Sequence, residues 1–487
     1  MYLRFALNNK RWRIQLMSKK WLLMLCGLAL LVNNALAQLP FSETNAELTL
    51  KFMVNDKPAT SEQIFSASDK INLFAEIKVD ASEVGQETSL YAVMMWNSVF
   101  FLMKNELGAW QPWSGELNEL IARSTKILSE TEALEIISGL KGMTGDFVVF
   151  VGYKAPQTGE IIYNAKPVTF SVQSVQQIMS NSLHGTTRGM AYFYAKEQGG
   201  FEQFTGKHYD ELPCSGCHIE QTACTTCHEV PGDSPDNDKC LESCHKRQNT
   251  EQQFHPDIHL MDKAAGGAGL KCASCHSAKQ VHGDGTPYNS LHENLNNVDC
   301  EQSGCHKDIT IAGKPMHETH VNDLECAACH VKTTMTCYSC HFADGSVFQP
   351  PIADWKILVK SKVSGKVTTG NIQTMAAGGN SLLVVAPYYG HTISKGSETT
   401  CSSCHDSDAV REYKETGTMT LATWHDTDKT INNIKGVVPI PSDWQTALKM
   451  DFIAKDENGE WAYEKDEADA TQMFFADPID VSKMPKL

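Results

Sequence analysis

Short runs of alternating apolar and polar residues dominate residues 41–175. Alternation of this kind, interrupted by turn-rich pieces such as APQTGE, is typical of strands that bury one face. The pattern predicts an antiparallel, immunoglobulin-like β-sandwich of about seven strands with its own hydrophobic core. The segment SETEALEIISGL is compatible with a short helix or with a loop beside a strand. The alternating runs are AELTLKFMV, INLFAEIKV, SLYAVMMW, FVVFVGY and PVTFSV.

Residues 350–390 return to strand-like patterning after a long stretch without it. The pieces DWKILVKSKVSGKVTTGNIQ and SLLVVAPYY predict a β-hairpin or a small sheet there. Residues 431–487 contain AKDENGEWAYEKDEADA, which predicts a solvated acidic face or tail. Such a segment could also dock on a positively charged partner.

The first 37 residues have the pattern of a secretory signal peptide. A basic stretch precedes the apolar run WLLMLCGLALLV, and ALA at residues 35–37 is a suitable cleavage site. The apolar run is short for a membrane span, and the mature chain contains no second run of that length. We therefore expect an exported protein, periplasmic or at the cell surface, without a transmembrane segment.

The net charge of the mature chain makes some classes of binding partner poor candidates. Loss of residues 1–37 removes six basic residues and no acidic one, so the formal net charge changes from −16 to about −22. An acidic protein of this kind is a poor candidate for binding nucleic acid or anionic lipid.

The cysteines carry the strongest chemical signal in the sequence. All 16 cysteines after residue 37 fall into pairs, and a histidine directly follows the second cysteine of every pair. Six pairs have the spacing CxxCH, whereas the pair at 240–245 is CxxxCH and the pair at 300–306 is CxxxxCH. The cysteines are Cys214, Cys217, Cys224, Cys227, Cys240, Cys244, Cys272, Cys275, Cys300, Cys305, Cys326, Cys329, Cys337, Cys340, Cys401 and Cys404.

Three chemistries use paired cysteines, and the histidines favour one of them. A zinc site takes four ligands and a disulfide takes two thiols, and neither needs a histidine fixed behind each pair. Covalent haem attachment needs all three groups, because the thiols form thioethers and the histidine ligates the iron. We therefore expect eight covalently bound haems c, with the two longer spacers leaving another ligand site or a disulfide open at those positions. The predicted proximal iron ligands are His218, His228, His245, His276, His306, His330, His341 and His405.

Each iron has a second axial position, for which ten further histidines are candidates. None of them lies in residues 38–183, and all lie in or beside the motif-bearing stretch. The pairs His255/His259 and His317/His320 have spacings that suit one helix face, so each could serve two neighbouring haems. The candidates are His184, His208, His255, His259, His282, His292, His317, His320, His391 and His425.

The density of motifs predicts the architecture of residues 180–430. Cys214 to His405 spans 192 residues, or 24 for each haem, which leaves little room for a protein core. We expect porphyrins to form the interior of a multihaem cytochrome c domain built from short helices and loops.

The eight motifs and the pieces CASCHSAKQVHGDGTPY, MHETHVNDLECAACH and APYYGHTI resemble octahaem c-type cytochromes of the tetrathionate-reductase-like group. The resemblance covers about residues 184–425. It implies close-packed haems, mostly with two histidine ligands. The N-terminal sandwich is similar to β-domains attached to secreted and surface multihaem cytochromes.

Two functions are compatible with this combination. The first is an electron-transfer conduit in anaerobic or extracellular respiration, linking quinol-linked or outer-membrane cytochromes to an extracellular acceptor or other redox partner. The second is an octahaem reductase of a small sulfur or nitrogen oxyanion such as tetrathionate, nitrite or hydroxylamine. The surplus of histidines favours the conduit, the resemblance favours the reductase, and no catalytic residue is assigned. The sequence leaves a monomer, a homo-oligomer and a filament open.

Overall fold

The chain divides into two compact units, residues 1–178 and 179–487. The predicted signal peptide, the cysteines and histidine of the motif at 214–218, and the whole motif at 337–341 lie outside the residues that the computed structural model describes. These described residues are 45–61, 63–164, 166–212, 215, 223–230, 232–293, 298–302, 304–306, 313–336, 354–395 and 399–481.

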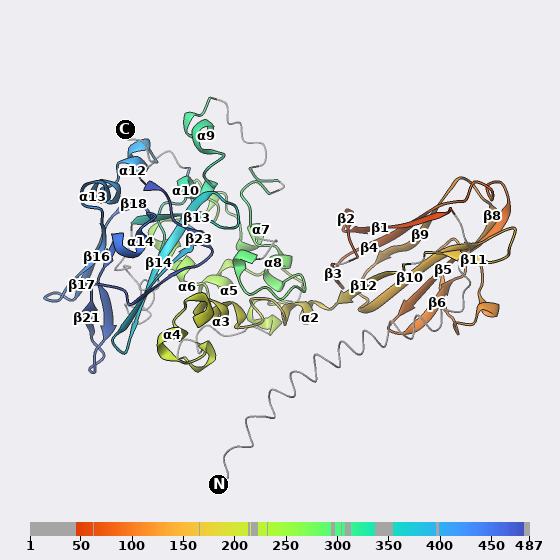
Figure 1. Cartoon of the computed structure of the whole chain (residues 1–487), viewed down its shortest axis with the longest axis horizontal. Coiled ribbons are helices and arrows are strands. Elements are labelled where there is room, and N and C mark those ends of the chain that lie inside the picture. The colour runs from red at the N-terminus through yellow and green to blue at the C-terminus, as the bar shows by residue number, and fades with distance from the viewer. Residues whose placement is uncertain are drawn as a thin grey trace, which may run out of the picture. The chain divides into compact units, whose positions relative to one another are not determined.

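The first unit is built from strands in two sheets, drawn red to yellow in Figure 1. The first sheet has the order β2-β1-β4-β9, and all its neighbours are antiparallel. Its strands are β1 (Glu47–Val54), β2 (Lys57–Ala59), β4 (Ile71–Lys78) and β9 (Thr131–Leu140).

The second sheet of this unit has the order β3-β12-β10-β5-β6-β7, with β11 paired to β10 and β8 paired to β5. Only β3 and β12 run parallel among these described pairs. The strands are β3 (Ile64–Ser66), β5 (Glu87–Trp96), β6 (Val99–Met103), β7 (Trp110–Pro112), β8 (Ser124–Ile127), β10 (Gly145–Lys154), β11 (Ile161–Tyr163) and β12 (Val168–Gln173).

One hydrophobic cluster joins the two sheets. It combines Leu73 and Leu134 of the first sheet with Leu90, Phe147 and Val149 of the second, all nearly or fully buried. The alternating runs thus predicted a β-rich unit correctly, although short strands such as β2, β3 and β11 raise the described number from about seven to twelve. The segment SETEALEIISGL is neither helix nor loop, because its alternate side chains are buried along β9.

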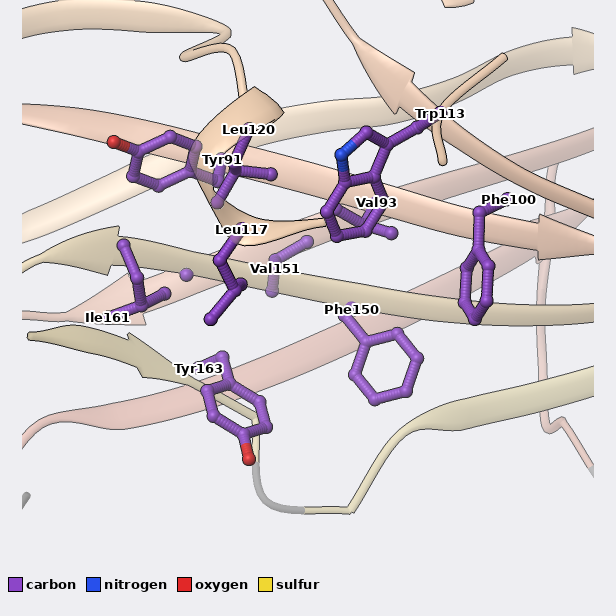
Figure 2. A pocket seen from close by; sticks show the side chains of 11 residues that line it. Tyr91, Val93, Phe100, Trp113, Leu117, Leu120, Phe150, Val151, Ile161 and Tyr163 are labelled. Carbon is purple, nitrogen blue, oxygen red and sulfur yellow. The ribbon is translucent and has the colours of Figure 1, made fainter. Parts of the chain in front are cut away.

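A small apolar cavity lies on the outer face of the second sheet, where the chain after β7 crosses the strands (Figure 2). Trp113 and Leu117 cover the strand residues Tyr91, Phe150 and Tyr163. Its free space of about 40 Å³ is lined by carbon atoms alone. This is a satellite core under a loop rather than a site with polar groups for a ligand.

The second unit combines short helices (green in Figure 1) with a set of strands drawn in cyan and blue. Residues 179–336 contain most of the described helices of this unit, and few of them exceed two turns. They are α3 (Arg188–Tyr194), α4 (Glu202–Thr205), α5 (Asn237–Leu241), α6 (Lys246–Phe254), α7 (Cys272–Cys275), α8 (Ala278–His282), α9 (Pro315–His320) and α10 (Cys326–His330), with α2 (Val175–Met179) at the boundary between the units.

The strands of the second unit form a main sheet with the order β18-β13-β14-β15-β22, to which β23 is added beside β13. Antiparallel β13, β14 and β15 occupy the region where a hairpin or small sheet was expected. The elements are β13 (Trp355–Ser361), β14 (Val367–Ala377), β15 (Asn380–Pro387), α12 (Cys401–His405), α13 (Asp408–Thr416), β16 (Met419–His425), β17 (Thr430–Asn433), β18 (Gly436–Pro439), α14 (Trp444–Ala447), β19 (Leu448–Met450), β20 (Phe452–Lys455), β21 (Trp461–Lys465), β22 (Ala470–Met473) and β23 (Ala476–Asp477).

The C-terminal residues 431–481 are not a tail. Trp444, Phe452 and Val481 are buried in one core with Trp355 of β13 and Val410 of α13. The acidic stretch at 456–470 is half-buried or exposed, as expected for a solvated face, whereas apolar residues before and after it close the main sheet. Consequently residues 180–430 and the C-terminal segment belong to one compact unit.

We predict that residues 41–178 fold alone, because their core needs no other part of the chain. Replacing the buried Leu73 with alanine should lower the free energy of unfolding of this isolated unit by about 2–5 kcal/mol. Ile127, which is 62 % exposed, is the control, and its replacement should change stability by less than about 1 kcal/mol. Urea unfolding measures both, and an insoluble fragment or equal losses would contradict the prediction.

Candidate functional site

Local helix geometry gathers the three groups of a CxxCH motif. Three described motifs lie on α7, α10 and α12. Residues at positions i, i+3 and i+4 share one face of a helix, so both thiols and the imidazole project together. Thr400 caps α12 by accepting a hydrogen bond from the Ser403 amide, which holds the turn at its first cysteine.

The two longer motifs also form the hydrogen bond between the histidine amide and the carbonyl of the first cysteine, despite their longer spacers. In the regular motif at 272–276, the His276 amide donates to the Cys272 carbonyl at 2.9 Å. The His245 amide reaches the Cys240 carbonyl at 2.9 Å, and the His306 amide reaches the Cys300 carbonyl at 3.1 Å. The extra residues therefore loop out. In the longest motif, Gly304 has φ of 86°, a conformation that favours glycine.

The described motif cysteines form no disulfide bond with one another, and they are half-buried or exposed. Thiols of successive motifs are also neighbours. The Cys240 thiol is hydrogen-bonded to the Cys272 thiol, and the Cys300 thiol is hydrogen-bonded to the Cys326 thiol. The other links are electrostatic neighbours, namely Cys227 with Cys240, Cys275 with Cys305, and Cys329 with Cys404. The described motifs therefore follow one another in space in the order in which they occur in the chain.

Every described motif histidine faces one histidine from outside the motifs. The six pairs join segments that are distant in sequence, and their ring centres are 5.8–6.4 Å apart. The pairs are His228 with His282 at 5.8 Å, His245 with His184 at 6.2 Å, His276 with His391 at 6.0 Å, His306 with His259 at 5.9 Å, His330 with His317 at 6.2 Å, and His405 with His320 at 6.4 Å.

This separation matches two imidazoles that share one metal ion. A metal–imidazole bond is roughly 2.0 Å long and the ring centre lies roughly 1.1 Å behind the nitrogen, so opposite ligands have centres roughly 6 Å apart. Ordinary aromatic contacts cover the same range of distances. Six motif histidines that each meet a histidine, rather than any other ring, favour axial ligation over ordinary contact. The residues present thus fit haem iron with two histidine ligands.

Hydrogen bonds at the Nδ1 atoms orient several of these rings. His259 Nδ1 lies 3.1 Å from the Asp257 carboxylate, His276 Nδ1 lies 2.8 Å from Gln280 Oε1, and His330 Nδ1 lies 3.0 Å from the Ser394 carbonyl. A partner at Nδ1 leaves Nε2 free to bind a metal, and such partners tune the ligand.

Burial keeps several of the paired imidazoles neutral. Burial and then the His245 ring lower the pKa of His184 to about 4, and burial and then the His276 ring lower the pKa of His391 to about 4. Burial followed by the His228 ring also lowers the pKa of His282. A neutral imidazole is the form that ligates metal ions.

Four of the ten candidate distal histidines do not face a described motif histidine. His208 is largely exposed and lies 3.0 Å from Glu202, and His425 is exposed on β16. His255 bonds through Nε2 to Asp354 at 2.9 Å. His292 is 9 % exposed and stacks on Phe475, and burial lowers its pKa to about 4. All four stay predictions with respect to the two motifs outside the described residues, although Asp354 occupies the Nε2 atom of His255.

The predicted sharing of a helix face is confirmed for one histidine pair and wrong for the other. His317 and His320 both lie on α9 and face two different motif histidines. In contrast, His255 ends α6 and His259 lies in the turn after Pro256, so these two do not share a helix face. Proline cannot continue the backbone ladder of α6, which explains the difference.

Sequence reasoning missed three buried charged residues next to these groups. Glu251 is fully buried, accepts hydrogen bonds from Tyr388 and the His391 amide, and has its pKa raised mainly by burial. Asp257 is 2 % exposed, and Lys356 is 6 % exposed on β13. Two sequence features could have indicated such residues. Lys356 lies inside the apolar run DWKILV, and Asp257 lies two residues before His259.

No protein-family model matches this chain, and no curated protein matches it either. Within the described ranges, no helix has the length and apolar character needed to cross a membrane. In that same part of the chain, no three or more His, Cys, Asp or Glu side chains converge as a metal-binding group.

Proposed function

We propose that this protein carries eight covalently bound haems c and conducts electrons among them. The facing histidine pairs carry the proposal, because all six described motif histidines have a partner at the distance that a six-coordinate iron requires. Each haem would supply one-electron exchange between Fe(II) and Fe(III). The chain supplies two thiols, two axial imidazoles and the spacing between sites.

The shortage of apolar side chains around the motifs supports a haem-filled interior. Few hydrophobic side chains are buried among the described residues of 179–336, and the large clusters of the chain lie elsewhere. A porphyrin is a large apolar surface, so eight of them would replace the missing core. Those buried side chains are Tyr209, Leu212, Ala328, Val331 and Met335.

The conduit, rather than the reductase, is favoured by the closed axial positions. An iron with imidazoles on both faces exchanges electrons but has no position for a substrate. The succession of neighbouring thiols from Cys227 to Cys404 supports a continuous path through the described sites. We propose that the protein belongs with the octahaem c-type cytochromes of the tetrathionate-reductase-like group.

The first unit supports a setting outside the cytoplasm. Its order β1-β4-β9 against β12-β10-β5 matches the A-B-E and G-F-C sheets of an immunoglobulin-like sandwich. We propose that the protein is exported by its signal peptide and exchanges electrons with quinol-linked or outer-membrane cytochromes or with an extracellular acceptor.

We predict that the mature protein begins near Gln38 and has eight haem additions. Denaturation leaves thioethers intact, so intact mass spectrometry counts the haems directly. Six additions with four unmodified or disulfide-bonded cysteines would mean that the motifs at 240–245 and 300–306 do not attach haem.

Replacing His317 with alanine should open one iron to small ligands. One haem should become high-spin and bind carbon monoxide, while the others stay low-spin, because only one axial imidazole is lost. Electron paramagnetic resonance and the carbon monoxide difference spectrum measure this. His425→Ala is the control and should match the parent protein. An unchanged spectrum for His317→Ala would contradict the pairing with His330.

We predict that nitrite, hydroxylamine and tetrathionate do not reoxidise the reduced protein catalytically. Stopped-flow mixing of dithionite-reduced protein with each compound tests this at the haem absorption bands. Sustained turnover with any of them would favour the octahaem reductase over the conduit.

A further inference from the structure

A carboxylate is buried between two of the histidine pairs, where its partners are His259 and the Ile393 amide. The Asp257 side chain is 3 % exposed, and its Oδ1 accepts from the His259 amide at 2.8 Å and from His259 Nδ1 at 3.1 Å. Its charge also acts on His391 and on the Cys275 thiol. No lysine or arginine forms an ion pair with it among the described residues. Asp257 therefore lies beside the sites at 272–276 and 300–306.

A cation is buried between the next two sites. Lys356 Nζ donates to the Cys329 carbonyl at 3.0 Å, and its charge acts on the thiols of Cys329 and Cys404. No carboxylate of the described residues lies within ion-pair distance of its Nζ. Lys356 lies on β13 between the buried apolar residues Trp355 and Ile357. Lys356 therefore lies beside the sites at 326–330 and 401–405.

Most other charges near these sites are paired, hydrogen-bonded or exposed, whereas Glu325, which acts on the Cys300 thiol, is half-buried and accepts a hydrogen bond from Ser364. Buried Glu251 has the Arg247 guanidinium close by, which lowers its pKa against the effect of burial. Asp299 and Glu301, which are near Cys326, are exposed. Water and salt weaken exposed charges, whereas a buried charge acts at low dielectric.

A buried charge of either sign shifts the reduction potential of a nearby iron. A carboxylate bonded to a ligating imidazole makes the ligand more basic and stabilises Fe(III). A buried ammonium stabilises the reduced state, which carries one positive charge fewer. The contact between the Cys300 and Cys326 thiols separates the two sites near Asp257 from the two sites near Lys356. Asp257 would therefore lower the reduction potential on one side of this contact, and Lys356 would raise it on the other side.

Building on the proposed electron-transfer function, we propose that Asp257 and Lys356 create a potential step in the middle of the haem chain. Asp257 lowers the potentials of the haems at 272–276 and 300–306, and Lys356 raises those at 326–330 and 401–405. One electron then passes downhill from Fe(II) at His306, which becomes Fe(III), to Fe(III) at His330, which becomes Fe(II). No proton or other reactant takes part in this step.

Potentiometric titration of the full-length protein, followed at the haem absorption bands, tests the step. Asp257→Asn keeps the hydrogen-bond acceptor and removes the charge, so up to two of the eight haems should shift to higher potential. Lys356→Gln keeps a donor, and up to two haems should shift to lower potential. We expect at least a tenfold change in each affected reduction equilibrium, which is about 59 mV for one electron. The exposed residues Asp262 and Lys360 provide the matched controls D262N and K360Q, which should titrate like the parent protein.

The outcomes separate this inference from the proposed function. A parent protein without haem would overturn the proposed function itself. Curves that superimpose on the parent curve, or shifts of the opposite sign, in variants that keep eight low-spin haems would overturn the potential step alone. If D257N loses haem, K356Q and K356R decide the question. K356R retains the charge and should restore the parent curve, and equal curves for K356Q and K356R would overturn the step.

Discussion

A narrow gap between facing imidazoles is the constraint around which the second unit is organised. Each of six motif histidines must be held about 6 Å from a histidine of another segment. A gap of this size would fit a metal ion held by one imidazole on each side. Short helices and turns can satisfy such a requirement only if something rigid supports them.

The main sheet of the second unit supplies part of that support. Residues after β15 pair with the segment after α10, where Val331 and Ile393 form a β-bridge and Thr392 bonds to Thr333. This connection fixes His391 and the backbone behind His330 at the same time. The C-terminal strands complete the core behind β13, so the residues that look like an acidic tail in the sequence stabilise the surface that carries the histidines.

Two buried charged side chains lie close to the histidine pairs. Most ionisable groups among the described residues are at least partly exposed, where solvent screens them. Asp257 and Lys356 are exceptions that lie close to different histidine pairs and thiols. Burying a charge that has no strong counter-ion is costly, so such residues are expected where the charge serves a purpose. In the proposed electron-transfer conduit that purpose would be to set the direction of electron flow, which depends on the potentials of neighbouring centres.

The sequence alone determined what is local. Each paired-cysteine motif occupies five to seven consecutive residues, so the two thiols and the histidine proposed to hold a haem could be predicted without a fold. The alternation of residues 41–175 likewise predicted a β-rich unit, because strand periodicity is a property of neighbouring residues. Only the tertiary structure decided which distal histidine meets which motif, since His276 and His391 are 115 positions apart and chain spacing says nothing about such pairs. The same holds for Lys356, whose burial between two motifs depends on how β13 packs, and for the last fifty residues, whose acidic composition concealed the apolar side chains that close the core.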